Sequence, residues 1–200
     1  MTRTRNQQQT KEKEQVDQVT KQQSLQLMKN LVLTAINSVA YLRHLFPEDC
    51  FQDRQLKDIT VKSLLPSKNN EARLLMSWIE KGAFEAIDKK FLSRIEFNVC
   101  TPGMSPGEHV LLESYIFSLT YPSEEDPNHG ECVITSSDVK NSTGLTGREI
   151  RTVRLIRTLI MLAQTLSGIP EDRFLSLKLH YRDDVTPLHY QPPLFKPGPD

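Results

Sequence analysis

The sequence predicts an α+β protein of two layers, in which three helices pack on one face of an antiparallel sheet. Three segments carry apolar residues at helical spacing, and three others alternate between apolar and polar residues. Along the chain these elements follow the order helix, helix, two strands, helix, strand. This order is typical of helices segregated on one side of an antiparallel sheet. A proline-rich tail follows the last strand.

Composition narrows the class of protein. The chain has 200 residues, enough for one domain with a real core, and its formal net charge is zero. No overall field therefore attracts nucleic acid or an anionic membrane. Three widely spaced cysteines favour a reducing compartment over a disulfide framework. Neither a signal peptide nor a membrane span is predicted, because the start is polar and every apolar run is short.

The N-terminal segment and the first helix are distinguished by their apolar content. Residues 1–23 are rich in Gln, Lys and Glu, and we expect them to be disordered because they cannot bury enough apolar surface. The first helix is expected from Ser24 to Phe46, ended by Pro47. It should lie in the middle of the core, because apolar residues cover much of its circumference, including Leu25, Met28, Val32, Ala35, Ile36, Val39 and Leu42.

The second helix is expected to begin with a cap at Asn69 or Asn70. Its apolar face carries Leu75, Trp78, Ile79, Ala83, Ala86 and Ile87. Gly82 lies within that face, where it costs about 1 kcal/mol of helix propensity. We expect the close approach of another backbone to be the reason for a glycine there.

Alternating residues predict the first strands. Ile95, Phe97 and Val99 alternate with polar residues, as do Tyr115, Phe117, Leu119 and Tyr121, so these segments should form an antiparallel pair. Residues 49–66 are expected to be irregular, with one short strand as an interpretation of residues 59–62. Residues 122–145 are polar and are expected to form a mobile surface loop.

The third helix is expected to open with the capping box Thr146–Glu149 and to close at Gly168 and Pro170. Its predicted buried face carries Ile150, Val153, Ile156, Ile160 and Ala163. Four arginines recur every three residues along it: Arg148, Arg151, Arg154 and Arg157. This band is more typical of a solvated face than of a site for phosphate or an acidic partner.

The last strand and the tail are the most informative part of the chain. Residues 174–182 place Leu175, Leu177, Leu179 and Tyr181 on one side and Ser176, Lys178, His180 and Arg182 on the other. The prolines that follow cannot donate to a sheet ladder, yet Val185, Tyr190, Leu194 and Phe195 are too apolar for an unattached tail. We therefore expect the tail to lie across a surface that it does not build, which favours binding over catalysis.

Motifs for other chemistry are weak. His129 and Cys132 have a metal-like spacing, but a structural zinc ion needs four ligands and no second pair is near. A small metal-dependent enzyme that uses His180, Asp183 and Asp184 remains an alternative. A histidine on a polar strand face is more often solvated, however, and an acidic pair after a strand more often ends it. No cofactor is predicted, and the chain is not expected to be an enzyme.

Four stretches carry a resemblance to a known family: residues 38–48, residues 78–82 with 89–92, residues 113–121, and the run from Leu177 to Pro187 followed by residues 190–193 and Phe195. They resemble HORMA domains, specifically those of meiotic chromosome-axis proteins, and plant axis proteins look most similar. The resemblance covers about residues 23–195. Spindle-checkpoint and DNA-repair HORMA adaptors share the element order but lack the last run, so they are alternatives of lower rank.

The resemblance implies a mechanism. In HORMA domains a mobile "safety belt" wraps over a partner peptide, the closure motif, which adds as a strand beside the last strand. The implied closure-motif contacts are Phe174, Ser176, Lys178, His180 and Arg182. The implied belt residues are Asp183, Asp184, Val185, Thr186, Pro187, Tyr190, Pro192, Pro193 and Phe195. A proline at Ser176 or Lys178 should block capture if the N–H that it removes faces the partner.

The family also implies the partners and the place of action. These are closure motifs of axis proteins, including C-terminal tails of its own family, and a remodelling AAA+ ATPase with its adaptor. The expected location is the chromosome in the nucleus, with indirect association with chromatin and none with membranes. We expect a HORMA core over residues 24–182 and the start of a belt over residues 183–200. Family members continue further, so the chain ends inside the belt, either as a fragment or as a short form.

Overall fold

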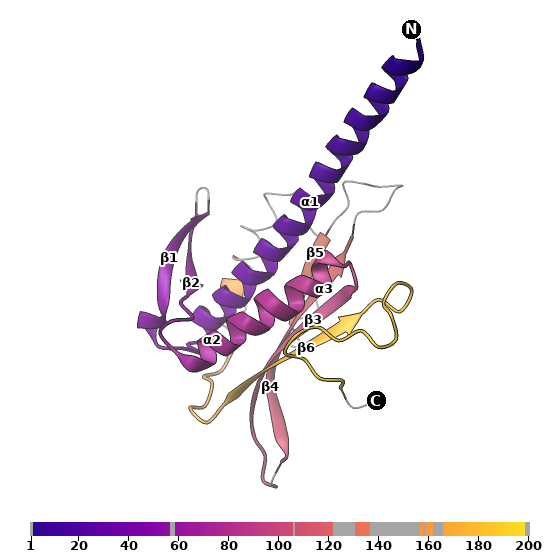
Figure 1. Ribbon diagram of the computed structural model, residues 1–200. Coiled ribbons are helices and arrows are strands. Elements are labelled where there is room, and N and C mark those ends of the chain that lie inside the picture. The colour runs from indigo at the N-terminus through magenta and orange to yellow at the C-terminus, as the bar shows by residue number, and fades with distance from the viewer. Residues whose placement is uncertain are drawn as a thin grey trace.

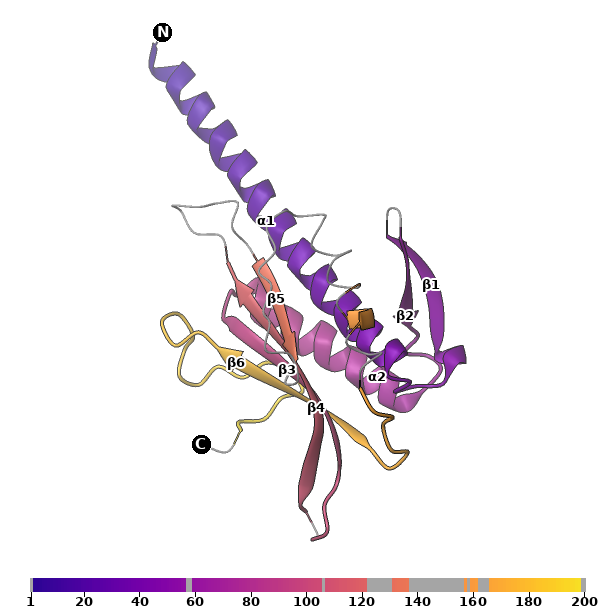
Figure 2. The same ribbon diagram turned by 180° about the vertical axis from the view of Figure 1, so that it is seen from behind.

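The computed structural model describes residues 2–56, 59–105, 107–121, 131–136, 157, 159–161 and 166–198. For residues 2–21, 56, 59 and 131–136 it describes the backbone alone. One four-stranded antiparallel sheet forms a layer, and the helices α1, α2 and α3 cover one of its faces (Figures 1 and 2). The predicted α+β two-layer class is therefore confirmed for the described residues.

Helix α1 spans Thr2–Leu42, so it begins well before the expected start at Ser24. We expected residues 1–23 to be disordered, whereas the structure describes residues 2–23 as helical backbone that continues α1 away from the body of the protein (Figure 1). Two physical reasons account for this difference. Gln, Lys, Glu and Arg have high helix propensity, and a helix that is already nucleated in the core propagates at low cost.

The C-terminal end of α1 also differs from the prediction. The helix ends at Leu42 rather than at Phe46, because His44 adopts a left-handed conformation with φ of 52°. The N–H of Leu45 donates to the carbonyl of Ala40 (2.9 Å), and that of His44 donates to the carbonyl of Tyr41 (3.1 Å). These two bonds form a Schellman motif, which terminates the helix before Pro47 is reached.

The next helical segment runs over three elements: α2 (Asn70–Ser77), the π-helical turn η2 (Trp78–Ala83) and α3 (Phe84–Asp88). The predicted cap is confirmed at Asn69, whose side-chain Oδ1 accepts from the N–H of Glu71 (2.7 Å) and of Ala72 (3.2 Å). The sequence did not predict the π-helical turn, a feature that is common at functional positions. The apolar face expected for this segment is buried, with the exception of Trp78, which is half-buried.

The sheet has the strand order β5-β4-β3-β6, built from β3 (Leu92–Pro102), β4 (His109–Thr120), β5 (Glu131–Ser136) and β6 (Phe174–Tyr181). Strand β3 pairs antiparallel with both β4 and β6, which confirms the predicted strand pair. Strand β5 lies within the segment that we expected to be a loop. That expectation was wrong for residues 131–136, where the short β-branched run Val133-Ile134-Thr135 favours a strand despite its polar flanks.

A separate hairpin joins β1 (Phe51–Leu56) to β2 (Ile59–Leu64). The short strand interpreted at residues 59–62 is confirmed, whereas β1 was missed because most of its side chains are polar. The ring of Phe51 anchors the hairpin on the end of α1, with ring centroids 5.3 Å from Tyr41 and 6.5 Å from Phe46.

The third predicted helix lies mostly outside the described residues, and so do its capping box and Arg148, Arg151 and Arg154. The described part is helical at Arg157 and at residues 159–161. Leu159 is 2% exposed and Ile160 is 37% exposed, so the predicted buried face is wrong at Ile160. Arg157 is exposed, as expected for a solvated face.

Candidate functional site

Strand β6 is an edge of the four-stranded sheet. It pairs with β3 on one side, and no other described strand pairs with its opposite side, which we call the free edge. The predicted alternation is confirmed: Leu175 and Leu177 are buried under the helices, whereas Lys178 is exposed on the other face of the sheet. A strand with an unpaired row of main-chain groups can accept another strand.

The main-chain groups of the free edge come from the odd-numbered residues of β6. The N–H of Arg182 donates to the carbonyl of Phe91 at 2.7 Å, so the main chain of Arg182 faces the β3 side. Because these groups alternate along a strand, those of His180, Lys178 and Ser176 also face β3. The free edge therefore presents the N–H and C=O groups of Leu175, Leu177, Leu179 and Tyr181.

The side chains of Ser176, Lys178, His180 and Arg182 lie on the polar face of the sheet, together with Arg94 and Glu96 of β3. Glu96 Oε1 is 3.2 Å from Arg94 Nη2 and 2.9 Å from His180 Nε2, the latter without the alignment of a hydrogen bond. Arg182 Nη2 is 2.7 Å from Asp184 Oδ2. Phe174 packs edge-on against His109, with ring centroids 4.7 Å apart.

The tail (residues 183–198) begins with a tight turn. The N–H groups of Val185 and Thr186 donate to the carbonyl of Arg182, at 3.4 and 3.0 Å, and Thr186 Oγ1 donates to the carbonyl of Phe91 at 3.4 Å. Asp183, Val185 and Pro187 are exposed. The turn reverses the chain, so the remaining residues return toward the helices (Figure 1).

Tyr190 is the first anchor of the tail. Its ring packs edge-on between Phe91 (centroids 4.9 Å apart) and Tyr181 (5.4 Å), and Lys89 Nζ lies 4.8 Å from its centroid. The hydroxyl is buried. Burial, followed by the nearby Glu85 carboxylate, raises the pKa of Tyr190, and the same two causes raise the pKa of Tyr181 to about 12.

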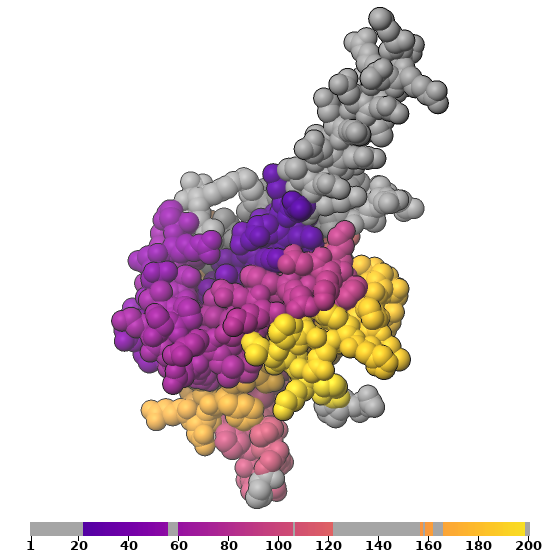
Figure 3. Space-filling model, in the orientation of Figure 1, coloured from indigo at the N-terminus to yellow at the C-terminus, as the bar shows by residue number. Residues whose placement is uncertain are grey.

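Phe195 is the second anchor, and it explains Gly82. A Cβ added at Gly82 would lie 2.2 Å from Cε2 of the Phe195 ring and 3.0 Å from the carbonyl oxygen of Pro193. We expected a close approach of another backbone; the nearest group is the aromatic ring, and the Pro193 carbonyl is second. The tail rests on the π-helical turn through this contact, and Figure 3 shows the C-terminal segment lying against this part of the chain. Pro192 is buried.

The predicted site residues therefore fall into two groups. The five predicted closure-motif contacts lie on or directly after β6, on the polar face. Of the predicted belt residues, Tyr190, Pro192, Pro193 and Phe195 dock the tail, whereas Asp183, Val185 and Pro187 do not. Sequence reasoning missed Lys89 and Phe91 as contacts of Tyr190, because nothing in their local pattern distinguishes them from surface residues.

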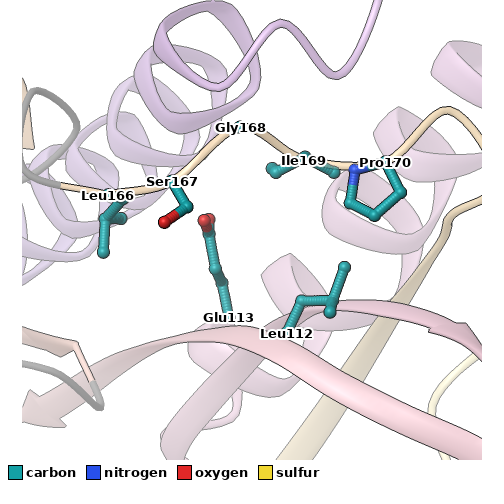
Figure 4. A pocket seen from close by; sticks show the side chains of 7 residues that line it. All are labelled: Leu112, Glu113, Leu166, Ser167, Gly168, Ile169 and Pro170. Atoms are coloured by element: carbon teal, nitrogen blue, oxygen red, sulfur yellow. The ribbon is translucent and has the colours of Figure 1, made fainter.

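Away from the free edge, a hollow of about 300 Å³ lies between β4 and residues 166–170 and is lined by Leu112 and Glu113 (Figure 4). The Glu113 carboxylate in this hollow already accepts hydrogen bonds from neighbouring side chains. Glu113 Oε2 accepts from Arg43 Nε (3.0 Å) and from the Tyr115 hydroxyl (2.8 Å), while Arg43 Nη2 donates to Glu113 Oε1 and to the Ser167 carbonyl. Since these groups satisfy one another, the arrangement is typical of a structural tie between α1 and the sheet.

Metal and membrane features can be stated for the described part of the chain. Among those residues no group of three or more His, Cys, Asp or Glu side chains could hold a metal ion. His129 and the side chain of Cys132, the weak zinc motif, lie outside them. Likewise, none of the described helices combines the length and the apolar character that crossing a membrane requires.

Comparison with known proteins agrees with this geometry. The family model of the HORMA domain matches residues 24–200. Meiosis-specific protein ASY1 of Arabidopsis thaliana is 34% identical over 90% of this chain and 31% of that protein. HORMA domain-containing protein 2 of Bos taurus is 35% identical over 88% of this chain and 56% of that protein. The chain thus spans less than two thirds of the length of these relatives.

Among solved structures, C. elegans HTP-2 bound to the HIM-3 closure motif has a TM-score of 0.67 at 15% identity, covering 90% of this chain and 77% of that one. This likeness shows the fold. The matched family is one of adaptor domains, in line with the expectation that the chain is not an enzyme. The match over residues 24–200 and the similarity to meiotic relatives show that the chain belongs to the HORMA domain family.

Proposed function

We propose that this chain is a non-enzymatic adaptor of the meiotic chromosome axis, which captures closure-motif peptides as an added strand on the free edge of β6. The tail then acts as a safety belt over the captured peptide. This activity serves homologue synapsis and recombination, and its place is the chromosome in the nucleus. Association with chromatin is indirect, through captured partners. Release of the peptide requires a remodelling AAA+ ATPase with its adaptor.

One observation carries the proposal: a strand with an unpaired edge is followed directly by a tail that docks on the neighbouring helices at Tyr190 and Phe195. An extended peptide on such an edge gains main-chain hydrogen bonds, and the side chains that flank the edge select its sequence. The curated relatives support the meiotic setting, and the HTP-2 structure is named as a complex with a closure motif.

The test is a peptide array. Overlapping peptides that cover Arabidopsis ASY1, including the part that this chain does not match, are probed with the purified chain. We expect a small number of neighbouring peptides to bind. Uniform absence of binding would refute the proposal, because ASY1 supplies the candidate tails of a family member.

Two variants locate the binding site. Leu179→Pro removes an N–H that faces the free edge, and Leu179→Ala removes the same side chain but keeps that N–H. We expect the proline variant to lose the array peptides and the alanine variant to keep most of its affinity. Thermal melting of both variants checks that the sheet is intact, and equal binding by the two folded variants would exclude the β6 edge.

A further inference from the structure

The side chains beside the free edge restrict the chemistry of a peptide that pairs with it. Side chains of a paired strand lie on the same two faces as those of the strand that receives it. On one face the neighbours are Leu177 and Leu179, which pack against the core under the helices. On the other face the neighbour between them is Lys178, whose side chain is exposed.

Lys178 is the charge on this polar face that the described residues leave without a close partner. Glu96 is shared by Arg94 and His180, at 3.2 and 2.9 Å, and Arg182 is paired with Asp184 at 2.7 Å. No described carboxylate lies within ion-pair distance of Lys178. Glu96 is the cross-strand neighbour of Lys178 in the β3–β6 register, but its carboxylate pairs with Arg94 and His180, so Lys178 is left at the middle of the edge without an ion pair among the described residues.

The register places that cation close to an incoming side chain. The main chain of Lys178 faces β3, so an antiparallel peptide meets this residue in a non-hydrogen-bonded pair. In such pairs the opposing Cα atoms are about 4.5 Å apart, closer than in hydrogen-bonded pairs. Opposite charges at directly facing positions stabilise a strand pair, and like charges destabilise it.

We propose that the captured peptide carries Asp or Glu opposite Lys178, between two apolar residues that pack beside Leu177 and Leu179. The inference rests on the proposed function, because it assumes that a peptide adds to this edge. It specifies the ligand as a segment that alternates apolar, acidic and apolar residues. A basic residue at the central position is rejected, since it would face Lys178 directly.

The test is a lysine scan of the array peptide that binds best. Each position is replaced by Lys in turn, and binding is measured by fluorescence anisotropy to the natural chain, to Lys178→Glu and to the control Lys68→Glu. Lys68 is exposed before α2, so the control makes the same change of net charge away from the edge. We expect Lys to weaken binding to every variant at the two apolar positions, and to weaken binding to the natural chain about three- to tenfold at the central position between them.

At that same position, Lys should strengthen binding to Lys178→Glu, and high salt should reduce both effects. The Lys68→Glu control should behave as the natural chain. The inference is overturned if no peptide position shows this response although Leu179→Pro still abolishes binding of the peptide. The proposed function would then stand. An identical response in Lys68→Glu also overturns it, because the effect would then be one of net charge. Absence of any binding peptide overturns both proposals.

Discussion

Replacing Gly82 by alanine should release the tail without unfolding the domain. The added Cβ would lie 2.2 Å from Cε2 and 2.7 Å from Cδ2 of the Phe195 ring, whereas carbon atoms in contact are about 3.5–4.0 Å apart. The ring must therefore move by more than an ångström. Full burial of a phenylalanine contributes about 1.5–3 kcal/mol, so the docking of this half-buried ring contributes about 1–2 kcal/mol.

The sign of the effect should depend on Phe195. In the natural chain, Gly82→Ala costs the docking energy, offset by about 0.5–1 kcal/mol because alanine favours the helical backbone. In a Phe195→Ala background the ring is gone, so Gly82→Ala should be neutral or stabilising, limited by the Pro193 carbonyl at 3.0 Å. A double-mutant cycle should thus give a coupling energy of about 1–2 kcal/mol.

Two measurements separate release of the tail from loss of the fold. Hydrogen exchange of residues 190–198 reports docking, and thermal melting reports the domain. The control is Gly168→Ala, because a Cβ at Gly168 would meet nothing within 4 Å. Gly82→Ala should speed exchange in the tail, whereas the control should not. Equal effects of Gly82→Ala in the presence and absence of Phe195 would refute the reasoning.

Three further predictions follow from the core, the tail and the N-terminal helix. Ile36→Ala should lower the free energy of unfolding by about 2–5 kcal/mol in chemical denaturation, because Ile36 is fully buried in α1; a loss below about 0.5 kcal/mol would contradict its core position. The raised pKa values of Tyr181 (about 12) and Tyr190 mean that their contribution to tail docking is complete below about pH 10 and is lost as pH rises toward 12. Hydrogen exchange across this range should show the loss in the natural chain, and a Tyr181→Phe, Tyr190→Phe double variant should lack it. Deletion of residues 1–23 should leave the melting temperature of the domain unchanged, since few of these residues are apolar; a large drop would show that the segment docks.

The parts of the fold that were predicted have strong periodicity. Residues 95–99, 115–121 and 174–182 alternate cleanly, so their strands and their faces could be assigned before the structure was known. Strand β1 could not, because its polar side chains carry no such pattern and its apolar Phe51 packs on Tyr41 and Phe46, which lie elsewhere in the sequence. The early end of α1 depends on the left-handed conformation of His44, which no periodicity encodes.

The contact that docks the tail could not be predicted from local sequence patterns. Its apolar residues predicted a docked segment, and Gly82 predicted a close approach, but each signal stands alone in the sequence. Only the fold shows that these two signals describe one contact, between Gly82 and the ring of Phe195. The contact joins positions far apart along the chain, so neither side specifies the other. A glycine within an apolar helical face thus indicates that something docks there, without identifying what does.

The direction of the main-chain groups on the free edge of β6 could not be predicted from the sequence. Alternation assigns side chains to faces, but it does not say which residues direct their main-chain groups outward. That assignment depends on the bond from Arg182 to Phe91 and on the bulge of β3 between Leu92 and Arg94. It follows that a proline at Ser176 or Lys178 would disrupt the hydrogen bonds between β6 and β3. Such a variant would test the stability of the sheet rather than the capture of a peptide. Main-chain pairing and charge selection at this edge therefore reside in neighbouring residues, so each can be altered while the other is kept.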